Sequence, residues 1–97
     1  MEILNFQFPS SKVKARRAHV GVVGSGDLEI LMEPSIDDAT HVTIQTSVTG
    51  FGDTWKAVLE RFLGQHPEAA SIEINDFGAT PGTVALRLQQ AVEESQS

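Results

Sequence analysis

Apolar and polar residues alternate along several stretches of this chain, and a two-residue period indicates strands with one buried face. The clearest case is residues 42–48, where the even-numbered side chains are Val, Ile, Thr and Val and the odd-numbered ones are Thr, Gln and Ser. Such a strand leaves a polar outer face on its sheet. The expected strands are residues 2–8, 18–23, 27–32, 42–48 and 71–77.

The spacing changes to three and four residues after the strand at 42–48, which is typical of an amphipathic helix. Asp53 is the expected N-cap, and Gly64 is placed to end the helix before Pro67. One buried stripe is predicted for this helix, formed by Trp55, Val58, Leu59, Phe62 and Leu63.

The last segment fits two patterns, because Val84, Leu86 and Leu88 alternate as in a strand whereas Val84 and Leu88 also fit a helical stripe. Thr80 as N-cap followed by Pro81 at the first helical position decides for a helix. The helix is expected over residues 81–94, with a disordered tail at 95–97.

These elements predict one α+β domain over residues 1–97. Their order is β-β-β-β-α-β-α, which suits a two-layer sandwich in which two helices cover one face of a mostly antiparallel sheet of about five strands. The strand-helix-strand unit at 42–77 predicts a right-handed parallel crossover.

The two strands between residues 18 and 32 predict a hairpin whose register follows from its side chains. If residues 24–26 form the loop, Ala18 pairs with Met32 and Val20 with Ile30, and one face is wholly apolar. A two-residue loop would mix polar and apolar groups on both faces. The three-residue loop is therefore preferred. It places Ser25 at the tip and requires positive φ at Gly26.

The composition of the chain argues against several classes of function. The formal charge of -6 argues against a nucleic-acid binder or an anionic-membrane binder, and no apolar run is long enough to span a membrane. We expect a soluble, cytoplasmic protein. There is no cysteine, so any thiol chemistry must come from a cofactor. Four cations lie within residues 12–17, and they suit either a solvated loop or a contact for phosphate or an acidic partner.

Two familiar motifs fit the glycines around Ser25 poorly. A dinucleotide-binding loop opens a helix, and a hydrolase nucleophile elbow needs glycine two residues before the serine, where this chain has Val23. Ser25 has no base in its local sequence, although a distant histidine could approach it in space. Asp27 and Glu29 beside it offer an acidic surface for a modifying enzyme. Ser25 is therefore expected to be an exposed attachment point rather than a nucleophile.

Two other constellations carry weaker signals. The three histidines, at positions 19, 41 and 66, share no spacing, so no metal site is predicted. Residues 76–82, DFGATPG, form a glycine-rich entry into a helix. That entry suits either helix capping and a tight turn or an anion held by backbone N–H groups, and both interpretations stay open.

The chain resembles a known family at these motifs. The run VGVVGSGDLE at 20–29, Trp55 and the DFGATPG segment are similar to the acyl carrier (delta) subunit of biotin-independent malonate decarboxylase. This resemblance covers essentially the whole chain. A weaker likeness to the carrier subunit of citrate lyase lies in residues 25–27, 51–53 and 78–79.

The resemblance implies a non-catalytic carrier. Ser25, flanked by Gly24 and Gly26, would hold phosphoribosyl-dephospho-coenzyme A through a phosphodiester bond, and acetyl and malonyl groups would be carried as thioesters. The implied partners are the acyltransferase (alpha) subunit, the decarboxylase (beta and gamma) subunits and the transferase that attaches the cofactor. The alternatives are a citrate lyase type carrier and a small serine hydrolase that uses Ser25.

Overall fold

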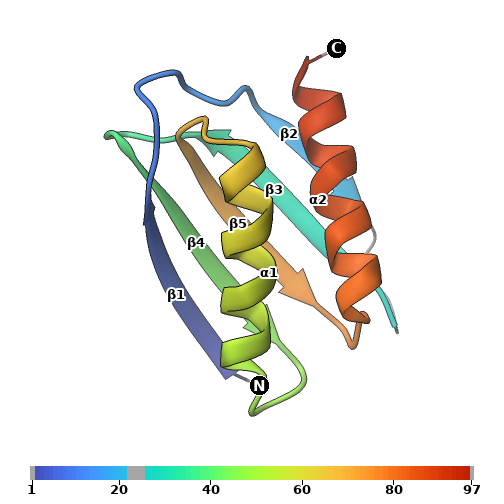
Figure 1. Ribbon diagram of the computed structural model, residues 1–97. Coiled ribbons are helices and arrows are strands. Elements are labelled where there is room, and N and C mark those ends of the chain that lie inside the picture. The colour runs from blue at the N-terminus through green and yellow to red at the C-terminus, as the bar shows by residue number, and fades with distance from the viewer. Residues whose placement is uncertain (1, 22–25, 97) are drawn as a thin grey trace.

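The computed structural model describes residues 2–21 and 26–96. Its elements follow the predicted order β-β-β-β-α-β-α (Figure 1). The strands are β1 (Glu2–Pro9), β2 (Ala18–Gly21), β3 (Leu28–Pro34), β4 (Ala39–Thr46) and β5 (Ala70–Asp76). The helices are α1 (Gly52–Gln65) and α2 (Pro81–Gln96).

The strands form one sheet in the order β1-β4-β5-β3-β2. The pair β4 and β5 is parallel, as the strand-helix-strand pattern predicted, and every other neighbouring pair is antiparallel. Strand β5 lies at the centre, between the β1-β4 pair and the β2-β3 hairpin. The chain therefore adds its last strand between two pairs that are formed from earlier residues.

The hairpin has the predicted register. Ala18 pairs with Met32 and Val20 with Ile30. The further pairs expected for Val22 and Val23 lie outside the described residues.

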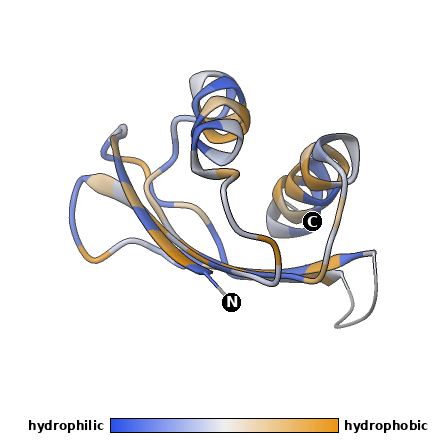
Figure 2. Ribbon diagram, turned by 90° about the horizontal axis from the view of Figure 1, so that it is seen from below, coloured by the Kyte–Doolittle hydropathy of each residue, from blue (hydrophilic) through white to orange (hydrophobic). Residues whose placement is uncertain are grey.

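Both helices pack on the same face of the sheet, which confirms the two-layer α+β sandwich (Figure 2). Alternation along the strands explains this layering, because one side of each strand supplies the core and the other side is polar. The core lies between the layers. It includes Leu28, Ile30, Val42, Ile44, Ile72 and Ile74 from the sheet and Trp55, Leu59, Val84, Leu88 and Ala91 from the helices.

Helix α1 differs from its prediction at both ends. Phe51 occupies the N-cap position without a side-chain cap, and the expected cap, Asp53, lies inside the first turn. The Trp55 N–H already bonds to the Phe51 carbonyl, so the first turn closes two residues earlier than expected. The helix continues through Gly64 to Gln65, since glycine permits helical dihedrals as well as a C-terminal turn.

Helix α2 begins as predicted, with the Thr83 N–H bonded to Thr80 Oγ1 at 3.2 Å. Its end lies further along the chain than residue 94, because the helix continues to Gln96. Ser95 is buried and donates to the Val92 carbonyl at 2.8 Å. The expectation of a disordered tail beginning at Ser95 is therefore wrong for that residue.

The connection between β3 and β4 is shorter than the loop predicted from its turn residues. Pro34 still pairs with Ala70, and Ala39 pairs with Pro9. In between, Ser35 Oγ donates to the Ala39 carbonyl at 2.6 Å, which closes the turn. Neither helix of the described chain has the length and apolar character needed to cross a membrane.

Candidate functional site

The structure describes the predicted attachment site from Gly26 onward. Gly24 and Ser25 lie outside the described residues, whereas Gly26 has a φ of 77°, as the hairpin register predicted. The Gly26 N–H donates to the Phe77 carbonyl at 2.8 Å, and the Phe77 N–H donates to the Asp27 carbonyl at 2.9 Å. These two bonds fix the chain that follows Ser25 beside the segment that follows β5.

A salt bridge holds the same point to helix α2. Arg87 donates from Nε to Asp27 Oδ1 at 3.1 Å and from Nη2 to Asp27 Oδ2 at 2.7 Å. Such a two-bond contact between guanidinium and carboxylate fixes orientation as well as distance. Arg87 also donates to Gln90, and the Leu28 N–H donates to Asp27 Oδ1. The base of the hairpin is thus tied to both layers of the fold.

The electrostatics of this salt bridge follow its geometry. Hydrogen bonding from Arg87, with a further bond from the Leu28 N–H, lowers the pKa of Asp27 below its ordinary value. The same bond to Asp27 raises the pKa of Arg87. The two charges therefore remain paired at neutral pH. Asp27 is therefore balanced by a cation within the chain, and the acidic surface expected for a modifying enzyme stays a prediction.

Glu29 is also engaged within the chain. Asn75 Nδ2 donates to its Oε1 at 3.0 Å, and His19 Nε2 lies 2.9 Å from its Oε2. The bond from Asn75, followed by that from His19, lowers the pKa of the Glu29 carboxyl. These three side chains connect β2, β3 and β5 across the outer face of the sheet.

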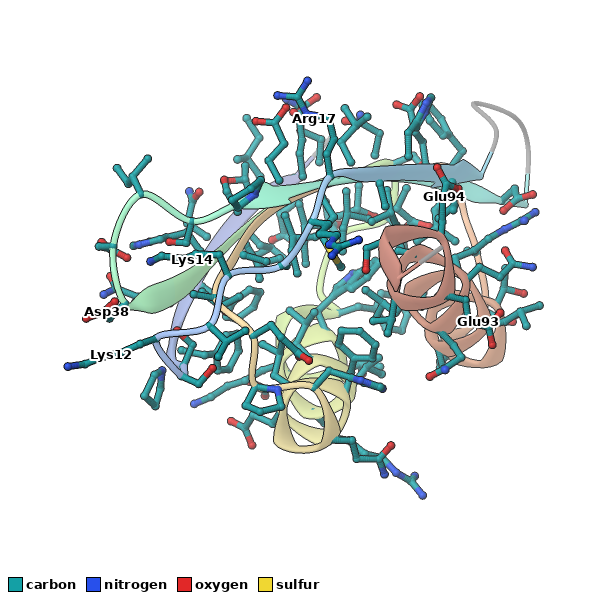
Figure 3. All side chains as sticks on the ribbon, turned by 90° about the horizontal axis from the view of Figure 1, so that it is seen from above. Lys12, Lys14, Arg17, Asp38, Glu93 and Glu94 are labelled. Atoms are coloured by element: carbon teal, nitrogen blue, oxygen red, sulfur yellow. The ribbon has the colours of Figure 1, made fainter. Side chains whose placement is uncertain are left out.

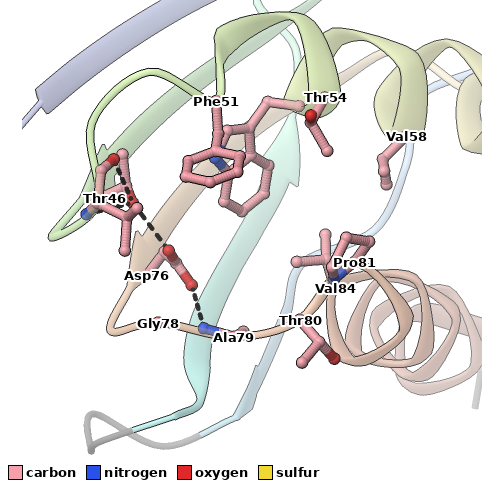
Figure 4. A pocket seen from close by; sticks show the side chains of 12 residues that line it. Thr46, Phe51, Thr54, Val58, Asp76, Gly78, Ala79, Thr80, Pro81 and Val84 are labelled. Atoms are coloured by element: carbon pink, nitrogen blue, oxygen red, sulfur yellow. Dashed lines mark hydrogen bonds between the residues drawn. The ribbon is translucent and has the colours of Figure 1, made fainter.

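The glycine-rich entry to α2 serves as a turn and a cap. Asp76 is buried, and its carboxylate accepts from Thr46 Oγ1 at 2.8 Å and from the Ala79 N–H at 2.9 Å (Figure 4). Gly78 has a φ of 96°, which supplies the sharp turn between these bonds. The N–H groups of Ala79 and Thr83 are both used inside the chain. Of the two interpretations of this motif, capping is the one observed.

A cavity of about 420 Å³ opens next to this turn. It lies where the first turns of both helices meet the carboxyl ends of the parallel strands β4 and β5 (Figure 4). Most of the surface that lines it is apolar. The lining residues are Thr46, Val48, Phe51, Thr54, Trp55, Val58, Asp76, Gly78, Ala79, Thr80, Pro81 and Val84.

The histidines lie apart from one another. His19 contacts Glu29, His41 Nε2 lies 3.0 Å from both carboxylate oxygens of Asp37, and the His66 ring packs on Phe62. Among residues 2–21 and 26–96, no three His, Asp or Glu side chains gather in a way that could hold a metal ion. Each histidine therefore has a local structural contact.

The basic run at 12–17 immediately precedes β2, whereas Gly26 follows the other end of that strand in the sequence. Figure 3 labels three cations of this run, Lys12, Lys14 and Arg17. Lys14 Nζ lies 3.5 Å from Asp38 Oδ1 and also bonds to the Asp37 carbonyl. Arg17 Nε lies 3.6 Å from Glu33 Oε1. Two of the four cations in the basic run are thus balanced by neighbouring carboxylates, which favours a solvated loop over a contact for phosphate.

Sequence reasoning missed Arg87 and the cavity. Arg87 is separated from Asp27 by 60 residues, and no local pattern connects two such distant positions. The one feature of the sequence that could have pointed to Arg87 is its position in the predicted helix, close to Val84 and Leu88 of the apolar stripe, which the structure buries. The cavity had no signal at all, because it forms only where four elements meet.

Comparison with known proteins shows which family this arrangement belongs to. The family of the malonate decarboxylase delta subunit (MdcD) matches residues 15–95. This chain belongs to that family. The malonate decarboxylase acyl carrier protein of Pseudomonas savastanoi pv. phaseolicola is 54% identical over 95 residues, which cover 97% of this chain and 96% of that protein. The malonate decarboxylase acyl carrier protein of Azotobacter vinelandii is 50% identical over 95 residues, which again cover 97% of this chain and 96% of that protein.

A solved structure agrees with this assignment. The chain resembles one in the crystal structure of a Pseudomonas malonate decarboxylase hetero-tetramer in complex with malonate, with a TM-score of 0.90 and 51% identity. The match covers 97% of this chain and 98% of that one. The delta subunit family is thus a family of acyl carriers rather than of catalytic subunits, as the resemblance implied.

Proposed function

We propose that this protein is the acyl carrier subunit of a malonate decarboxylase. The observation that carries the proposal is the identity of 50% or more with named malonate decarboxylase acyl carrier proteins over nearly the full length of both chains. The relative of known structure comes from a hetero-tetramer, which supports a role among other subunits. The relatives named above are all malonate decarboxylase proteins, which favours this carrier over the citrate lyase type.

We further propose that Ser25 carries phosphoribosyl-dephospho-coenzyme A through a phosphodiester bond. The terminal thiol of that group would supply the thioester on which acetyl and malonyl groups are carried. The residues present fit such a group in two ways. The chain contains no cysteine of its own, and a Cβ placed on the exposed Gly26 meets no atom within 4 Å outside its two chain neighbours, so the space around Gly26 is open.

The chain's own contribution would be to present Ser25 Oγ and to fix the position of the residues that directly follow Ser25. Asp27 is fixed in this way by Arg87 and Phe77. Gly24 and Gly26 add no side chains next to the serine in the sequence, which would ease the approach of the attaching transferase. That enzyme would supply the base that deprotonates the serine.

The proposed partners are the acyltransferase (alpha) subunit, the decarboxylase (beta and gamma) subunits and the phosphoribosyl-dephospho-coenzyme A transferase. A carrier must reach all of them in turn. A net charge of -6 suits this role, because electrostatic attraction accelerates encounters between complementary surfaces. We expect the assembly to be cytoplasmic.

Intact mass measurement tests the attachment. Co-expression with the cofactor and its transferase should give a protein that is heavier than its sequence by the prosthetic group, with the added mass located on the peptide that contains Ser25. Ser25→Ala should abolish the added mass, whereas Ser47→Ala, at an exposed serine elsewhere in the chain, should retain it. Circular dichroism should show both variants folded. An unmodified wild-type mass under these conditions would contradict the proposal.

A further inference from the structure

The cavity beside the α2 entry is apolar but contains one buried charge. Asp76 is 4% exposed, and its two carboxylate oxygens accept from Thr46 and Ala79. No Lys, Arg or His is among the lining residues. A ligand carboxylate would therefore be buried without a cation and close to Asp76, at a cost in free energy. The lining suits an uncharged ligand that is mostly apolar.

The size of the cavity suits a small organic group. At about 420 Å³ it falls within the range of about 300–1,000 Å³ that is typical of small-molecule sites. Phe51, the N-cap residue of α1, is 50% exposed, whereas Trp55 in the first turn of α1 is 6% exposed. Both residues line the cavity, so one exposed and one buried aromatic ring offer a ligand apolar surface to contact.

The cavity also adjoins the chain that follows Ser25. The Gly26 N–H bonds to the Phe77 carbonyl, and the next two residues after Phe77, Gly78 and Ala79, line the cavity. Gly26 is the residue after Ser25 in sequence. One hydrogen bond thus connects the neighbour of the attachment residue to the cavity wall.

We propose that this cavity binds the acetyl thioester end of the prosthetic group and excludes the malonyl form. The proposal rests on the attachment to Ser25 argued above. The acetyl end is uncharged and apolar, so it matches the lining. The malonyl end adds a carboxylate for which the cavity has no cation, and it remains outside. The resting acetyl form is then protected from water while the malonyl form stays accessible to the decarboxylase subunits.

Titration of the unmodified protein tests the cavity by itself. Trp55 is the single tryptophan, so its fluorescence reports directly on the lining. S-Acetyl-N-acetylcysteamine should give a saturable change, and S-malonyl-N-acetylcysteamine should bind at least about tenfold more weakly because its carboxylate is buried unpaired. No saturable change with the acetyl compound, or equal binding of the two, would overturn the proposal.

Two variants locate the binding. Phe51→Asp removes the exposed ring that lines the cavity but suits the N-cap of α1, so the fold should persist. It should weaken the binding of the acetyl compound, and Phe51→Leu should restore most of it. Ile36→Asp is the control, because Ile36 is 98% exposed and lies outside the cavity. Equal weakening by Ile36→Asp would show that the effect is one of charge alone and would count against the site.

The loaded protein gives a second readout. Hydroxylamine should cleave its acetyl thioester more slowly in the wild type and in Ile36→Asp than in Phe51→Asp, as followed by intact mass. If a loaded protein forms but all three are cleaved at the same rate, the cavity does not protect the thioester and the proposal fails. If no loaded protein forms at all, the attachment proposal fails, and the titration alone decides what the cavity binds.

Discussion

Gly21 and Gly26, which lie before and after Ser25 in the sequence, both adopt the left-handed conformation, but for different structural reasons. Gly26 has a φ of 77° and open space where a side chain would lie. Gly21 has a φ of 89°, and a Cβ placed there would lie 2.1 Å from the Leu28 carbonyl oxygen. At Gly26 only the backbone conformation favours glycine. At Gly21 the close approach of β3 also disfavours any side chain.

This difference predicts unequal effects of alanine at the two positions. Gly26→Ala should destabilise the fold by about 1–2 kcal/mol, the cost of a left-handed L-residue. Gly21→Ala should cost about 1–3 kcal/mol more, because the main chain of Leu28 must also move. Urea unfolding followed by Trp55 fluorescence measures both. Gly64→Ala, in α1, has negative φ and open space and should stay within about 1 kcal/mol of wild type. Equal losses at Gly21 and Gly26 would contradict the steric argument.

At the scale of elements, the Asp27–Arg87 salt bridge connects the helix layer to the sheet at the point from which the serine segment extends. Arg87 comes from α2, and Asp27 immediately precedes β3. In the last turn of the same helix, Glu94 Oε1 accepts from the His19 N–H in β2 at 3.3 Å. Helix α2 therefore contacts both arms of the hairpin, one from near its middle and one from its last turn.

The salt bridge should make stability depend on pH. The pKa of Asp27 is lower in the folded chain than the value of about 3.9 expected when unfolded. Its contribution is therefore present above that value and is lost as the pH falls through the folded pKa. Arg87→Met should lower the urea midpoint at pH 7, and the difference from wild type should shrink near pH 2. A loss that does not change with pH would mean that Arg87 acts through packing. Arg61→Met, at an exposed position on α1, should have little effect at either pH.

The periodic patterns predicted the existence and type of every element, and the errors lie at the element ends. Alternation and helical spacing report which side chains are buried, and burial extends over most of each element. Element ends depend on single backbone bonds instead. The Trp55 N–H closes the first turn of α1 on Phe51, where the chain offers Asp53 as a better capping residue. Ser95 is held in α2 by a bond to Val92, although its sequence suggests a loose tail.

At the scale of the whole molecule, the central position of β5 explains how the site is assembled. This strand joins the β1-β4 pair to the hairpin, and its end supplies both Asp76 and the Phe77 carbonyl. The cavity and the attachment segment therefore share one strand end. The sequence predicted the parallel crossover and the hairpin register from local patterns. It could not predict that β5 lies between β4 and β3, because the choice of neighbouring strands depends on contacts between residues that are distant in the sequence.

The central strand leads to a prediction about cooperativity. If residues 1–97 form one domain, the hairpin cannot stay folded when β5 loses its packing. Ile74 is fully buried at the centre of the core, and Ile74→Ala should cost about 2–5 kcal/mol. Ile3→Ala, at a residue that is 60% exposed on β1, should cost less than about 0.5 kcal/mol.

For wild type and both variants, urea unfolding followed by far-ultraviolet circular dichroism and by Trp55 fluorescence should give coincident single transitions. The two signals report on different parts of the molecule, since the first averages over strands and helices whereas the second reports on the face of α1 that meets the cavity. Separate midpoints in Ile74→Ala would mean that β1, β4 and α1 unfold independently of the hairpin. The chain would then behave as two units, and the serine segment could be released from α2 without unfolding the cavity.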